Sequence, residues 1–155
     1  MSKRFIASLS VAAIALAAGS AYSQTQFGTA AEARAMEEKA VTEMKANEAA
    51  AIEKFNSGTG SFRDRDLYVF CYNMTSGAFT AHINKALIGT DVRALKEKAG
   101  APLGQKIFDQ IKSSPEGTIT TVAYNFPKPG TDNPVPKESF VARVGNQGCG
   151  VGYYK

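Results

Sequence analysis

Residues 29–56 contain no glycine and no proline, and they are rich in alanine, glutamate, lysine and methionine. Their apolar side chains recur roughly at helical spacing, which predicts a long helix near the start of the chain. Asn47 followed by Glu48 is typical of a helix that restarts from an N-cap, so two segments are expected. The glycine-containing run that extends to Gly60 ends the helical region.

The pattern then changes to that of β-strands, and a sheet region is expected over residues 62–155. Residues 66–73 are dense in β-branched and aromatic side chains, a Thr-Ser-Gly turn follows, and residues 78–82 return as a second strand. This arrangement predicts a hairpin. Residues 103–113 carry apolar side chains on one side and end shortly before Pro115, which predicts a helix.

Three more strands are predicted after this helix, at residues 117–126, 139–144 and 148–154. A loop with four prolines separates the first two of them. The order of helix, two strands, small helices and three strands predicts an α+β fold, in which helices pack on an antiparallel sheet.

The first 23 residues have the layout of a cleaved secretory signal. Lys3 and Arg4 precede a short apolar run, and small residues lead to an expected cut between Ser23 and Gln24. Removing 23 of the 155 residues leaves 132, which is enough for one domain over residues 24–155. Two of the 18 basic residues and none of the 14 acidic ones lie in the signal, so the mature chain carries a net charge of only +2. We therefore expect a periplasmic protein that binds no nucleic acid.

The two cysteines allow one pairing, between Cys71 and Cys149. A disulfide is expected because exported proteins meet an oxidising compartment. The alternative is two isolated cysteines that pack as small apolar core residues.

Enzymatic interpretations find little support in these residues. A single histidine excludes a histidine-rich zinc site, and the two cysteines are too far apart in sequence for a CxxC pair. No nucleophile elbow, P-loop or dinucleotide fingerprint is present. The glycine-rich run at residues 145–152 precedes no helix, so it is no phosphate-binding loop. We expect neither catalysis nor a cofactor.

The chain resembles the single Cache domains, which are extracytoplasmic sensor modules of bacteria. The resemblance rests on the string FRDRDLYVF at residues 62–70, the Ala-His end of the hairpin at residue 82, the Leu-Ile-Gly of residues 87–89 and the closing GVGYY of residues 150–154. It implies a PAS-like five-stranded antiparallel sheet with the long N-terminal helix on one face. On the other face it implies a small-molecule pocket, walled by the short helices and loops.

Family members are mostly the sensing parts of chemoreceptors and histidine kinases. Since this chain ends at Lys155 without a predicted membrane helix, we expect a free-standing periplasmic form. Such a protein would pass on a signal by binding a membrane receptor or kinase, or by sequestering its ligand.

Strand alternation separates two faces on the first long strand and on the last one. Tyr68, Phe70 and Tyr72 share a face, and so do three alternate glycines at residues 148–152. The family's sheet order implies that these strands are neighbours, and a disulfide would then set the aromatic face beside the glycine face. Large flat side chains next to missing ones leave room for a ligand. The alternative is that glycine lets a helix pack closely and the aromatics fill the core.

Six residues are the candidates for lining the pocket. They are Tyr68, Tyr72, His82, Lys85, Tyr124 and Lys137. A histidine at a strand end can hydrogen-bond a carboxylate, with Lys85 supplying charge, although it can equally support the strand end. Arg143 suits a carboxylate if it faces inward, but exposure on the outer face is a serious alternative.

Two functions from different classes remain open at this stage. The first is a periplasmic binding or sensor module for a small polar metabolite, an organic acid or an amino acid, held without chemistry. The second is an interaction protein whose long helix docks on a membrane sensor or on a second copy as a homodimer, with a vestigial pocket. The alanine-rich stripe of that helix is too irregular for a strict coiled coil.

Overall fold

Two consecutive helices begin the part of the chain that this computed structural model describes, residues 26–155. They are α1 (Ala30–Ala46) and α2 (Glu48–Ser57). Thr29 caps α1 in a reciprocal capping box with Glu32. Asn47 ends α1 and caps α2 by accepting a hydrogen bond from the backbone N–H of Ala50. The predicted helix with a restart at Asn47 is confirmed, whereas the expected signal peptide lies outside the described residues.

An antiparallel sheet follows, with the strand order β1-β2-β6-β5-β4 and with β3 paired on β2. Its strands are β1 (Arg63–Asp64), β2 (Leu67–Asn73), β3 (Phe79–Ala81), β4 (Thr120–Pro127), β5 (Pro134–Val144) and β6 (Gln147–Tyr154). Between β3 and β4 lie the short helices η1 (Lys85–Leu87) and η2 (Val92–Ala94) and the longer α3 (Leu103–Ser113). The predicted α+β class, hairpin and third helix are all confirmed.

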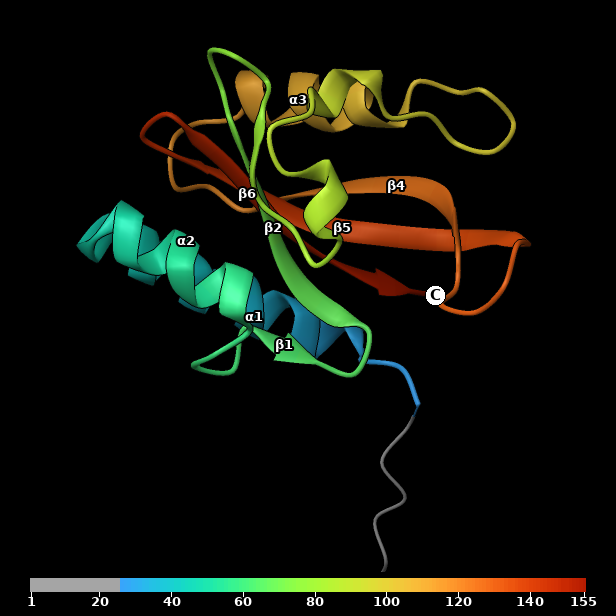
Figure 1. Cartoon of the computed structure of the whole chain (residues 1–155), viewed down its shortest axis with the longest axis horizontal. Coiled ribbons are helices and arrows are strands. Elements are labelled where there is room, and N and C mark those ends of the chain that lie inside the picture. Colours follow the sequence, from blue (N-terminus) through green and yellow to red (C-terminus); the bar gives the residue numbers. More distant parts are fainter. Residues whose placement is uncertain (1–25) are drawn as a thin grey trace, which may run out of the picture.

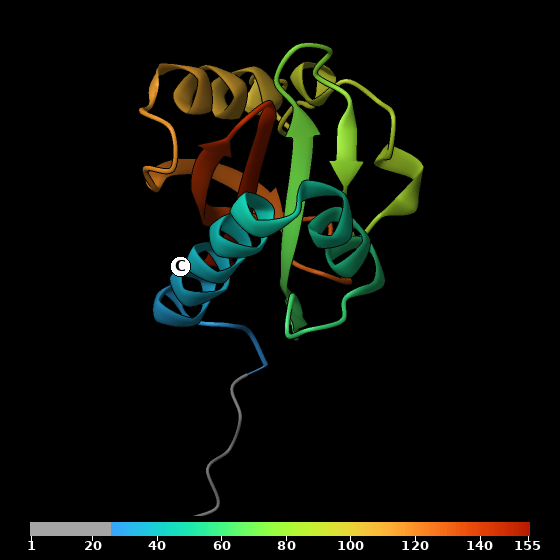
Figure 2. The ribbon, with the colours of Figure 1, turned by 90° about the vertical axis from the view of Figure 1, so that its left-hand side faces the viewer.

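The helices cover opposite faces of the sheet. Figure 1 shows α1 and α2 on one side of the strands and α3 on the other, and Figure 2 shows the same three layers from the side. Each face has its own buried cluster, one formed with α1 and α2 and the other with α3 and η2. No helix among residues 26–155 is both long and apolar enough to span a bilayer.

Strand β5 begins earlier than predicted. Pro134 and Pro136 belong to it, although the prolines of this region indicated a loop. Both pair with β4, while the pairing of β5 with β6 starts only at Lys137. Pro136 faces Lys155, just beyond the end of β6, and its carbonyl accepts a hydrogen bond from the N–H of Lys155. The missing N–H of Pro136 therefore lies outside the β5–β6 pairing.

Cys71 and Cys149 are bonded and lie directly opposite each other on β2 and β6. The expected disulfide is therefore present, and the first long strand and the last strand are neighbours as the resemblance implied. The disulfide lies in the cluster beneath α1 and α2. The opposite face carries Tyr68, Phe70 and Tyr72 beside the glycines of β6, as predicted.

One buried carboxyl group destabilises the packing of α1 against the sheet. Glu37 is fully buried on the inner side of this helix, and neither carboxyl oxygen has a hydrogen-bond partner in the described structure. Burial raises the pKa of Glu37 well above its usual value, because the charged form loses its hydration.

Replacing Glu37 by leucine is expected to raise the free energy of unfolding by about 1–3 kcal/mol, since it removes a buried group without partners. A carboxyl group whose pKa is higher in the folded than in the unfolded state lowers the free energy of unfolding as the pH rises above the unfolded-state pKa. The gain should therefore be larger at pH 8 than at pH 5. Urea unfolding at both pH values measures it, and a variant that is less stable than the wild type at pH 8 would contradict this account.

Candidate ligand-binding site

A cavity of about 480 Å³ lies between the sheet and the segments that follow β3. Strands β2, β4, β5 and β6 supply its floor, while η1, η2 and α3 supply its other walls. Most of the lining is apolar, and it includes the aromatic residues Tyr68, Phe70, Phe79, Tyr124, Phe126 and Tyr154. Its charged lining residues are Arg63, Arg65, Asp66 and Lys137. This volume and composition are typical of small-molecule sites.

The glycines of β6 have two different roles. A Cβ added at Gly148 or Gly150 would lie within 3.0 Å of the ring of Tyr72 or Phe70, so aromatic side chains fill the space above these two residues. A Cβ at Gly152 would instead meet the side chains of Lys137 and Tyr124 at the cavity. The close-packing alternative therefore holds at one end of β6, and the cavity occupies the other end.

Lys137 is the central polar group of the site. Its side chain is only 4% exposed, and its ammonium lies 4.4 Å from the ring centroid of Tyr154, 5.4 Å from that of Phe126 and 5.6 Å from that of Tyr68. The residues that the structure describes offer it no ion pair within 4.0 Å. Burial lowers the pKa of Lys137 to about 8, against an opposing effect of Asp66. The rings stabilise a cation but supply no counter-ion.

His82 follows β3 and reaches the same cavity. Its Nδ1 accepts a hydrogen bond from the backbone N–H of Asn84 at 2.9 Å. Burial lowers the pKa of His82 to about 4, so the ring is neutral at neutral pH. A neutral imidazole that accepts at Nδ1 carries its proton on Nε2, which leaves one N–H donor for a ligand.

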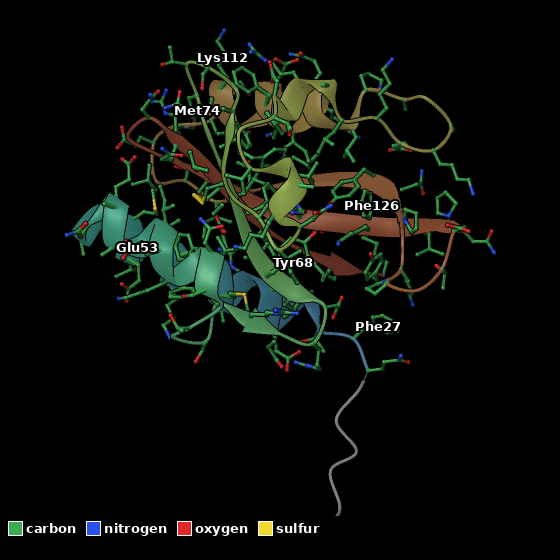
Figure 3. The ribbon with its side chains drawn as sticks, viewed as in Figure 1. Phe27, Glu53, Tyr68, Met74, Lys112 and Phe126 are labelled. Carbon is green, nitrogen blue, oxygen red and sulfur yellow. A yellow bond between two sulfur atoms is a disulfide. The ribbon has the colours of Figure 1, made fainter. Side chains whose placement is uncertain are left out.

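Asp66 closes one end of the cavity. Its Oδ1 accepts a hydrogen bond from the backbone N–H of Gly28 at 2.6 Å and so holds the segment before α1 against the sheet. Its Oδ2 is buried and has no partner in the described structure. Phe27, beside Gly28, packs edge-on against Tyr154. Figure 3 shows Phe27, Tyr68 and Phe126 toward one end of the sheet and Met74 toward the other.

Four of the six predicted lining residues meet in the cavity. They are Tyr68, His82, Tyr124 and Lys137. The ring of Tyr68 lies edge-on to His82, with 5.2 Å between centroids. The hydroxyl of Tyr124 is 2.8 Å from Ser139 Oγ. Burial raises the pKa of Tyr68 to about 12, so this hydroxyl keeps its proton throughout the neutral range.

The structure places the other two predicted lining residues outside the cavity. Tyr72 has no exposed surface, because it stacks on Phe108 beneath α3 with 5.8 Å between ring centroids. Lys85 turns toward α2, where its ammonium donates hydrogen bonds to the backbone carbonyl and to Oδ1 of Asn56. Arg143 lies on the same face of β5 as Lys137 but does not line the cavity either.

Several lining residues were not among the predicted ones. Asp66 belongs to a charged string in which solvated roles are the usual expectation, and only tertiary packing buries it. Tyr154 is the last residue of β6 and Phe126 the last but one of β4, and both rings lie next to Lys137. Strand parity groups Phe126 with Tyr124, so that signal was available from the sequence. Among residues 26–155 no group of three or more histidine, cysteine or acidic side chains has a metal-binding arrangement.

A family model described as Cache domain matches residues 28–151, which is most of the chain. This chain belongs to the Cache domain family. The Cache fold inferred from the sequence is therefore confirmed. A comparison with curated protein sequences gives no match.

Three solved structures share the fold. A methyl-accepting chemotaxis protein from Vibrio parahaemolyticus is 22% identical, with a TM-score of 0.62 over 80% of this chain and 86% of that one. The periplasmic sensor domain of a chemotaxis protein is 24% identical, with a TM-score of 0.57 over 78% and 86%. A Cache chemosensory domain that recognises carboxylic acids is 22% identical, with a TM-score of 0.55 over 78% and 80%.

Proposed function

We propose that this Cache domain binds a small organic acid whose carboxylate lies against Lys137. The observation that carries the proposal is a buried ammonium that faces an apolar cavity without a counter-ion from the described residues. A buried charge is costly unless it is paired, and a bound carboxylate would supply the missing pair. Carboxylic acid recognition by one similar Cache domain agrees with this assignment.

Two other groups would complete the carboxylate site. The Nε2–H of His82 is a neutral donor on the wall of the same cavity, and Tyr68 lies between His82 and Lys137. A carboxylate has about four acceptor positions, so it can accept from Lys137, His82 and the Tyr68 hydroxyl together. We therefore propose Lys137, His82, Tyr68 and Tyr124 as ligand-contacting residues. No bond to the ligand is made or broken in this proposal.

The proposed setting is the periplasm, with residues 1–23 removed as a signal peptide and residues 24–155 forming a single domain. The comparison with solved structures supports an extracytoplasmic location, because one similar structure is a periplasmic sensor domain. In this setting the bound state would be read by a membrane receptor or kinase, or the domain would act as a homodimer.

A thermal-shift screen of oxidised residues 24–155 tests the proposal. The panel contains organic acids, amino acids, amines and purines, and each hit is titrated. A ligand present at a hundredfold excess over its Kd should stabilise the folded protein by about 2.7 kcal/mol. Stabilisation by acids but not by amines or purines supports the proposal. A flat response from folded protein would contradict it and favour a protein-interaction role with a vestigial pocket.

The pH dependence of binding provides an independent prediction. The cationic form of Lys137 binds the carboxylate, and its pKa of about 8 means that the cation is lost above that pH. Neither of the other two proposed donors changes its protonation state between pH 5.5 and pH 9.5, because the pKa of His82 is about 4 and that of Tyr68 is about 12. Affinity should therefore be constant from pH 5.5 to pH 7 and should fall about tenfold per pH unit well above pH 8. Equal affinity at pH 7 and pH 9.5 would show that Lys137 is not the partner.

A further inference from the structure

The cavity has a charged end and an apolar end. Its charged lining residues all come from residues 63–66 and from Lys137, which pairs with Tyr154 at the end of β6. The apolar end is bounded by Phe70, whose ring fills the space above Gly150. Lys137 Cε lies 2.8 Å from the position of a Cβ at Gly152, and Gly152 is two residues from Gly150. Since strands rise about 3.3 Å per residue, about 7 Å along β6 separates the charged group from the wall formed by Phe70.

The apolar end is continuous with the core under α3. Phe70, Val92, Leu103 and Ile107 line the cavity and also belong to this buried cluster. None of the charged lining residues lies at this end. A ligand with a second carboxylate there would bury a charge without a partner, which is strongly unfavourable.

The cavity also lacks an accessible anion for an amino group. Among residues 26–155, Asp66 is the only acidic residue that lines the cavity. One of its oxygens accepts from the backbone of Gly28, and the other is buried within the wall. An ammonium next to the ligand carboxylate would therefore lose its hydration without gaining a salt bridge.

We propose that the ligand is an amphipathic monocarboxylate, with its carboxylate at Lys137 and an unsubstituted aryl or medium-length alkyl chain directed toward α3. This inference rests on the proposed function and narrows it, since the sequence alone left organic acids and amino acids open. The cavity of about 480 Å³ lies within the range of about 300–1,000 Å³ that holds much larger molecules than acetate.

Calorimetric titration of oxidised residues 24–155 with six ligands tests the inference. Acetate, butyrate and hexanoate form a chain-length series, and 3-phenylpropionate, phenylalanine and succinate vary the substituents. Each added methylene should lower Kd about fourfold, which corresponds to about 0.8 kcal/mol per buried methylene. We expect 3-phenylpropionate to bind at least tenfold more tightly than phenylalanine, and butyrate at least tenfold more tightly than succinate.

The outcomes separate this inference from the proposed function. If acetate, succinate or phenylalanine binds as tightly as hexanoate or 3-phenylpropionate, the proposal of an amphipathic ligand is wrong, but the proposal of a carboxylate site is still supported. If no acid in the series binds to folded protein, both are overturned.

Two variants locate the chain of the ligand. Leu103→Ala should weaken hexanoate at least fivefold and leave acetate within twofold, because Leu103 lines only the apolar end. Leu95→Ala, at a partly buried lining position, serves the same purpose if the first variant does not fold. Ile88→Ala is the control, since this residue is 38% exposed and lies outside the cavity lining. Hexanoate affinity that is unchanged in both leucine variants would contradict the proposed orientation.

Discussion

Replacing Lys137 by methionine is expected to weaken carboxylate binding by at least about a hundredfold. Removing one partner of a buried charge pair typically costs about 2–5 kcal/mol, and a hundredfold loss corresponds to about 2.7 kcal/mol. The same substitution should raise the free energy of unfolding by at least about 1 kcal/mol at pH 7, because the empty site buries an ammonium without a partner. A residue whose replacement weakens ligand binding and stabilises the folded protein functions in binding at a cost in stability.

Lys85→Met provides the matched control for this experiment. Lys85 is also a lysine near the cavity, but its ammonium is bonded to Asn56 and lies outside the lining. We expect its variant to bind acids within twofold of the wild type. The account would be wrong if Lys137→Met retained wild-type affinity, or if Lys85→Met lost as much affinity as Lys137→Met.

Removing the disulfide is expected to produce the largest loss of stability. The bond between Cys71 and Cys149 closes a loop with a sequence separation of 78 residues. For a loop of this size the chain-entropy model gives about 4.5 kcal/mol, and removing a native disulfide from a small secreted domain typically costs about 2–5 kcal/mol. We expect the double variant Cys71→Ala with Cys149→Ala to lose about 3–4.5 kcal/mol of unfolding free energy in urea.

Reduction of the wild type supplies a second measurement of the same quantity. Wild-type protein in dithiothreitol should unfold at nearly the same urea concentration as the double variant, since both lack the cross-link. The disulfide lies in the cluster beneath α1 and α2, on the face of the sheet opposite the cavity. Variant protein that is still folded should therefore retain its affinity for acids. A loss below about 1 kcal/mol would contradict a stabilising role for this disulfide.

Most of the fold could be predicted from the sequence, because local signals and burial patterns agree along the chain. Helices α1 and α2 carry their own start and stop signals at Thr29, Asn47 and Gly58. The family's sheet order and the expected disulfide indicated that the aromatic face of β2 would lie beside the glycine face of β6. Strand β5 was the exception, since its prolines are tolerated only because β6 ends beside them.

The candidate site could be predicted only in part, because side-chain direction beyond strand parity depends on tertiary contacts. Tyr72 shares its strand face with Tyr68, yet α3 covers the first residue and leaves the second at the cavity. Lys85 follows His82 by three residues, but Asn56 at the end of α2 draws its ammonium away. Asp66 becomes part of the wall only because the segment at Gly28 packs on it.

The measurement that tests the central claim most directly is the number of protons taken up when an acid binds. Calorimetric titration of hexanoate is performed in two buffers of different ionisation enthalpy, at pH 6.5 and at pH 8.5. With the pKa of Lys137 at about 8, most Lys137 side chains are neutral at pH 8.5, so the protein should take up roughly half a proton or more on binding, because the carboxylate binds the cationic form. Uptake should be close to zero at pH 6.5. Binding without proton uptake at pH 8.5 would contradict a carboxylate site built on Lys137.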